Sequence, residues 1–160
     1  MKRVIGFGVL VIVGLVISHF TSADRNDAGE ITKSGDVSVT EVQLGDCFDD
    51  LTDSSGEAVT LSSLHAVPCS EGHHWQVFHQ EDISLADYDE ETVSQTAEYI
   101  CNQAADILFA NMSAIKFDAY QYANLTLTYP TYKSWTVSSD HAVGCLVGDH
   151  SDTFYSSVFE

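Results

Sequence analysis

The feature that most limits this chain is an apolar run directly behind a basic N-terminus. Lys2 and Arg3 are followed by residues 4–20, which carry no charge, and no acid occurs before Asp24. A run of about 17 such residues lies between a long signal-peptide core and a short membrane-spanning helix. Because positive charge stays cytoplasmic, we expect the remainder to be extracytoplasmic. We favour a single-pass cell-membrane anchor over residues 1–23; the alternative is a secreted protein cleaved near Ala23.

The part of the chain behind this run is strongly acidic. The 160 residues include 24 Asp and Glu against 6 Lys and Arg, a formal net charge of -18, and only four of the basic residues follow Asp24. Such a surface repels phosphate, which excludes nucleic-acid binding. Apolar residues make up 44% of the chain, enough for one buried core and too many for a disordered acidic tail. We expect a polar linker over residues 24–40 and one domain over residues 41–160.

Four cysteines follow the apolar run, at positions 47, 69, 101 and 145. In an oxidising compartment an even number of cysteines most simply means disulfides, and three pairings are possible. The most local pairing is Cys47–Cys69 with Cys101–Cys145. No Cys-x-x-Cys motif occurs, so the sequence gives no support to a redox couple or to covalent haem.

One helix is clear from the apolar pattern of residues 90–109. Asp89 can cap its first turn, where Glu90 and Glu91 meet the positive end of the helix dipole. Apolar residues recur there at three- and four-residue steps and predict one buried stripe: Val93, Ala97, Ile100, Cys101, Ala104, Ile107 and Leu108.

The other elements are predicted to be strands. Short β-prone segments lie at residues 42–44, 59–67, 73–78 and 154–159, and a period of two over residues 115–129 predicts two strands or one bent strand, ended by Pro130. The acidic segment 49–56 has the wrong ligand spacing for a calcium loop and is predicted to be a solvated turn. The whole predicts an α+β domain with a small, mainly antiparallel sheet, one main helix and two disulfides.

The order of these landmarks resembles the septum-formation domain family of actinobacteria. The most specific segments are Gly45-Asp46-Cys47-Phe48 and Pro68-Cys69, the latter followed by His73. Cys101 in a helix, Pro130, Trp135 and Cys145-Leu146 follow in the same order. The likeness covers residues of about 41–160 and implies an extracytoplasmic domain on a membrane anchor or lipoprotein. This chain departs from the family at Gly72, His74, Gln76 and 138–140.

Four histidines gather around one predicted strand: His65, His73, His74 and His79. Neutral imidazoles can bind zinc or copper. However, His73 and His79 would lie about 20 Å apart in a continuous strand, too far to share one ion. A structural His73 donating to the backbone near Cys69 is the preferred interpretation, and the alternative is a metal- or small-ligand-binding envelope protein.

No pattern of catalytic residues stands out. The chain has no Gly-x-Ser-x-Gly elbow, and the disulfides would consume every thiol. Aromatic residues could form a ligand platform, although core packing is their commoner use: Trp75, Trp135, Tyr120, Tyr122, Tyr129 and Tyr132.

The sequence therefore predicts a non-catalytic, membrane-tethered extracytoplasmic domain without a cofactor. It would act as a protein-interaction or accessory subunit, associated with division or with a larger membrane complex. Its partners would be proteins in or near the cytoplasmic membrane that present a basic patch to the acidic surface.

Overall fold

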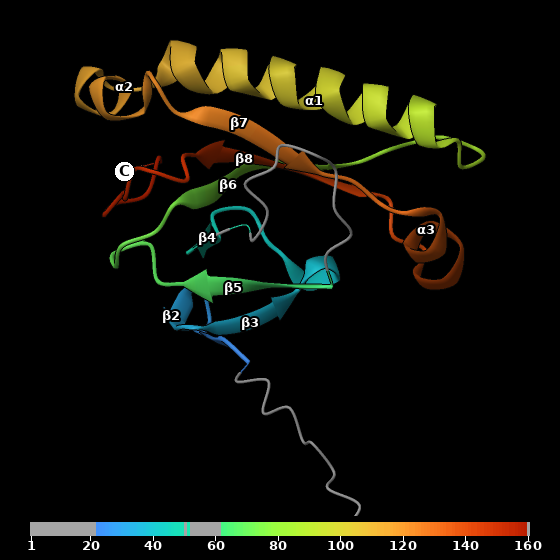
Figure 1. Ribbon diagram of the computed structural model, residues 1–160, viewed down its shortest axis with the longest axis horizontal. Coiled ribbons are helices and arrows are strands. Elements are labelled where there is room, and N and C mark those ends of the chain that lie inside the picture. Colours follow the sequence, from blue (N-terminus) through green and yellow to red (C-terminus); the bar gives the residue numbers. More distant parts are fainter. Residues whose placement is uncertain (1–21, 50, 52–61, 160) are drawn as a thin grey trace, which may run out of the picture.

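The computed structural model describes residues 22–49, 51 and 62–159. These residues form an α+β domain with a curled six-stranded antiparallel sheet, a two-stranded sheet and one main helix (Figure 1). The elements in chain order are β1 (Asp24–Arg25), β2 (Ile31–Lys33), β3 (Gly35–Ser38), the 3-10 helix η1 (Val39–Glu41), β4 (Cys47–Phe48), β5 (Ser63–Val67), β6 (Trp75–Asp82), α1 (Glu90–Asn111), α2 (Ala114–Tyr120), β7 (Asn124–Thr128), α3 (Tyr132–Ser138) and β8 (Ala142–Gly148).

The strands of the large sheet run in the order β3-β5-β4-β6-β8-β7. The continuous apolar run that forms β8 suits a strand buried on both faces, and β8 lies between β6 and β7. Helix α1 lies beside β6, β7 and β8, while β2 and β3 lie at the opposite end of the domain (Figure 1). The described chain therefore begins far from α1.

Alternating side chains of the central strands supply two apolar clusters. In β8, Val143, Cys145 and Val147 join the cluster under α1, whereas Leu146 joins the second cluster with Trp75. This is the period of two expected of a strand covered on both faces. The second cluster brings in residues of β2, β3 and β5, so it ties the N-terminal half to the sheet.

The main helix extends the predicted one by two residues. The Asp89 carboxylate accepts from the backbone N–H of Thr92, as an N-cap residue should. Its buried residues are Val93, Ala97, Cys101 and Ala105. Ile107 was expected on the buried stripe, but it is 65% exposed.

Two disulfides link parts of the fold that are distant in sequence. Cys47 on β4 pairs with Cys69, and Cys101 on α1 pairs with Cys145 on β8. This is the most local of the three possible pairings. The second bridge fastens α1 to β8, the strand beside the edge strand β7.

The polar linker expected over residues 24–40 is corrected by the structure, because these residues form part of the domain. Strand β3 pairs with β5, and Ser22 already bridges Asp36. The Arg25 guanidinium forms two bonds with the Asp46 carboxylate, of 2.6 and 2.7 Å. Asp46 is 3% exposed, and this partner raises the pKa of Arg25. A polar segment is thus held in the domain by strand pairing and by a partly buried ion pair.

Three predicted strands are also wrong. Residues 42–44 follow η1 and form no strand, and residues 154–159 form only the bridge between Phe154 and His73. Residues 115–120 belong to α2, which Ser113 caps by accepting from the Lys116 N–H. Only residues 124–128 of that stretch form a strand. Pro130 precedes α3, a helix that the sequence pattern missed.

Some predictions concern other parts of the chain. Of the anchor predicted over residues 1–23, residues 1–21 lie outside the described residues, whereas Ser22 and Ala23 belong to the domain. Most of the acidic turn 49–56 and the first residues of segment 59–67 also lie outside the described residues. Within residues 22–49, 51 and 62–159, none of the helices combines the length and the apolar character needed to cross a bilayer.

Candidate functional site

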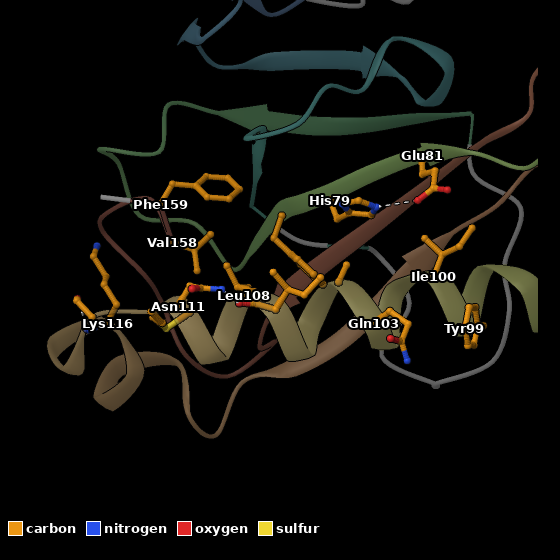
Figure 2. Close-up of a pocket in the computed structure, with 15 residues that line it drawn as sticks. His79, Glu81, Tyr99, Ile100, Gln103, Leu108, Asn111, Lys116, Val158 and Phe159 are labelled. Carbon is orange, nitrogen blue, oxygen red and sulfur yellow. Dashed lines mark hydrogen bonds and ion pairs between the residues drawn. The ribbon is translucent and has the colours of Figure 1, made fainter.

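An apolar groove runs along the side of α1 that faces β6 and the C-terminal segment (Figure 2). Its volume is about 690 Å³, within the range of ligand sites. Helix α1 supplies most of its apolar lining. The groove is lined by Phe78, His79, Glu81, Tyr99, Ile100, Gln103, Ala104, Ile107, Leu108, Asn111, Met112, Ser113, Lys116, Val158 and Phe159.

A β-bulge in β6 determines which side chains reach this groove. The register with β8 shifts between Val77 and His79, so Phe78 is the extra residue. Beyond the bulge, His79 and Glu81 line the groove, whereas the Gln80 amide donates to the Val42 carbonyl at 3.0 Å. A bulge changes the facing of the residues that follow it. Here it directs a histidine and a carboxylate toward α1.

The wall opposite α1 includes a C-terminal strap, residues 154–159, which is held by side chains. The Gln76 amide donates to the Ser157 hydroxyl at 2.8 Å, and its carbonyl oxygen accepts from the Val158 N–H at 2.6 Å. Gln76 is 1% exposed. The Tyr120 hydroxyl donates to the Ser156 carbonyl at 3.1 Å, and burial raises the pKa of this phenol to about 12. These contacts place Val158 and Phe159 beside the groove.

The two ends of the groove differ in polarity. Lys116 lies at one end beside Asn111, while His79 and Glu81 lie farther along β6 (Figure 2). The Lys116 ammonium donates to the Ser156 hydroxyl and to the Ser157 carbonyl. The His79 imidazole and the Glu81 carboxylate approach to 3.3 Å. An apolar floor with a cation at one end and a carboxylate at the other suits an elongated amphipathic ligand.

The histidines singled out in the sequence do not converge on one point. His73 is buried, and its Nδ1 lies 3.1 Å from the Glu71 carbonyl, two residues from Cys69. Burial lowers the pKa of this imidazole. In the described part of the chain, no three potential metal-ligating residues gather into a site.

The remaining histidines have separate neighbours. The His74 Nδ1 lies 3.0 Å from the Asp149 carbonyl, and the His65 Nδ1 lies 3.3 Å from the Asp36 carboxylate. His79 belongs to the groove. The four histidines therefore do not share one site in the described part of the chain.

The aromatic residues also fail to form one platform. Trp75, Trp135 and Tyr120 are buried, and Tyr120 stacks on Phe154 with ring centroids 4.4 Å apart. Tyr122 is 84% exposed and lies outside the groove. Packing explains the buried aromatics.

The residues that form the groove were mostly expected in the core or passed over. Ile100, Ala104, Ile107 and Leu108 belonged to the predicted stripe, but that stripe is too wide for the sheet to cover. This excess width was the available sequence signal. The bulge at Phe78 left no such signal.

Comparison of the chain with models of protein families, with curated proteins and with solved structures finds no match.

Proposed function

We propose that this chain is a non-catalytic, membrane-tethered extracytoplasmic domain that binds a protein partner. It would serve as an interaction or accessory subunit in the actinobacterial envelope, associated with division or with a larger membrane complex. The resemblance to the septum-formation domain family remains the basis for that location.

The observation that supports binding is the exposed apolar groove in an acidic protein. Large apolar side chains surround it, with Tyr99 67%, Ile107 65% and Phe159 52% exposed. An exposed cluster of large apolar side chains beside a formed groove is typical of an interaction site. The net charge of -18 would attract a basic surface and speed association.

Crosslinking of the full chain in intact cells tests this proposal. We expect one stoichiometric protein partner with a basic surface, and we expect its binding to weaken as salt rises from about 0.05 to about 0.5 M, because salt screens exposed charges. Binding that strengthens or stays constant over this range would contradict the acidic docking surface.

A further inference from the structure

We propose that the groove beside α1 receives an amphipathic α-helix of the partner, with apolar anchors toward the groove and basic residues on its flanks. This inference rests on the proposed function and identifies the partner segment. Four features of the groove lead to it: the chemistry of its α1 side, its length, its lack of a strand edge and its polarity.

The side of α1 that lines the groove carries no charge. Tyr99, Gln103 and Ile107 recur at four-residue steps along it. Glu98 and Asn102 instead line a separate small hollow beside β7. An uncharged, partly apolar helix flank within such an acidic molecule has the composition of an interface core, where charged residues are depleted.

The length of the groove matches about three helical turns. Tyr99 and Asn111, at its two ends, are twelve residues apart on α1, which is about 18 Å along the helix axis. A partner helix of about 12 residues would span it, with anchors at the spacing i, i+3 or i+4, and i+7 that helix-in-groove recognition uses.

The groove favours a helix over an extended peptide. Its walls are a helix flank, a sheet face and the C-terminal strap, and the edge strands of the large sheet, β3 and β7, do not line it. An extended peptide would find no row of backbone groups to pair with, whereas a helix satisfies its own backbone hydrogen bonds.

The charged ends of the groove give the partner helix a direction. A helix carries partial positive charge at its N-terminus and partial negative charge at its C-terminus. Lys116 therefore favours the C-terminal end of the partner helix, and Glu81 favours its N-terminal end. Lys116 lies beside the end of α1 and Glu81 toward its first half (Figure 2), so the partner helix would run parallel to α1.

A synthetic helix tests this assignment on the full chain, purified with both disulfides formed and held in lipid nanodiscs. The probe is a peptide of about 14 residues with Leu on one face, Lys on the other and a free C-terminal carboxylate, followed by fluorescence anisotropy. We expect Ile107→Asn to weaken binding about tenfold. Val137→Asn is the matched control, because Val137 is 75% exposed on α3 and lies outside the groove.

Peptide variants separate the groove from unspecific charge attraction. A scrambled peptide of the same composition should bind at least about tenfold more weakly, and amidation of the C-terminus should weaken binding to the natural chain but not to Lys116→Gln. Equal binding of the scrambled peptide, or equal affinity of Ile107→Asn, would overturn the assignment.

The same variants would reveal a different occupant of the groove. Palmitate that displaces the peptide and needs Ile107 would assign the groove to lipid, and a dimer abolished by Ile107→Asn would assign it to a second copy. Either result overturns the helix proposal. A photocrosslinker that captures the cellular partner from position 137 but not from position 107 would refute the groove while the proposed function stands.

Discussion

Replacing Gln76 with leucine should destabilise the domain by about 3 kcal/mol. Leucine has a similar size but removes the amide that donates to Gly45 and Ser157 and accepts from Val158. The two donated hydrogen bonds contribute about 1 kcal/mol each net, and a buried N–H left without an acceptor costs about 1–3 kcal/mol, of which the lower end gives the total of about 3 kcal/mol. The Val158 N–H is such a group, because its bond to Gln76 is buried.

Urea unfolding with both disulfides intact would measure the change, and Gln80→Leu is the matched control. Gln80 lies on the same strand, but it is exposed and its amide donates to the Val42 carbonyl, so we expect a loss below about 1 kcal/mol. Hydrogen exchange should also rise over residues 154–159 in Gln76→Leu alone. A loss below about 1 kcal/mol in Gln76→Leu would refute the role assigned to this amide.

Three further changes test the framework of the fold. Burial lowers the pKa of His73, so the folded state binds a proton there less readily than the unfolded state does. The free energy of unfolding should therefore fall as the pH drops below about 6.5, by up to about 1.4 kcal/mol per pH unit. His73→Asn should flatten this decline in pH-dependent urea unfolding, and the exposed His65→Asn should not; equal profiles would contradict the account. Replacing Cys101 and Cys145 with alanine opens a loop of 44 residues and should cost about 4 kcal/mol in the chain-entropy model, read as a lower urea midpoint; an unchanged midpoint would contradict it. Asp46→Asn leaves a partly buried guanidinium without its carboxylate and should cost about 3 kcal/mol; a loss below about 1 kcal/mol in the same assay would show that the ion pair is not what holds the N-terminal strands.

The main helix could be predicted because its signals are local. The cap at Asp89 and the recurrence of Val93, Ala97 and Cys101 lie within a few residues of one another and need no knowledge of the rest of the fold. The α+β class followed from the same kind of pattern. The small number of cysteines and their spacing made the local disulfide pairing the simplest one.

The segments that were predicted wrongly owe their structure in part to contacts with residues that are distant in sequence. Ile115 and Phe117 imitate the alternation of a strand, yet both are exposed, and α2 depends on a local cap and on Tyr120 packing against Phe154. Segment 24–40 has weak periodicity because its place in the domain depends on the pairing of β3 with β5 and on the contact from Arg25 to Asp46. Sequence pattern carries no information on such contacts.

The candidate site was hidden for a related reason. Trp75, Gln76, Val77 and Phe78 have the sequence of a regular strand, and the register shift that redirects His79 depends on how β6 pairs with β8. Ile107 was expected to be buried because its spacing is right, but the sheet covers only one side of the stripe. The prediction identified the apolar residues of the helix but not which of them the sheet would leave exposed.

The pairing of Ser22 with Asp36 has a consequence for how the domain would be mounted. If residues 4–20, the uncharged run within the anchor predicted over residues 1–23, lie in the membrane, only Thr21 separates them from Ser22, the first described residue. That gap is about 7 Å at full extension. The domain would then be held close to the bilayer surface, with little freedom to move away from it. The end of the domain that holds β2 and β3 would lie near the lipid headgroups, and α1 would lie at the opposite end (Figure 1). A partner would therefore have to extend above the membrane surface to reach α1.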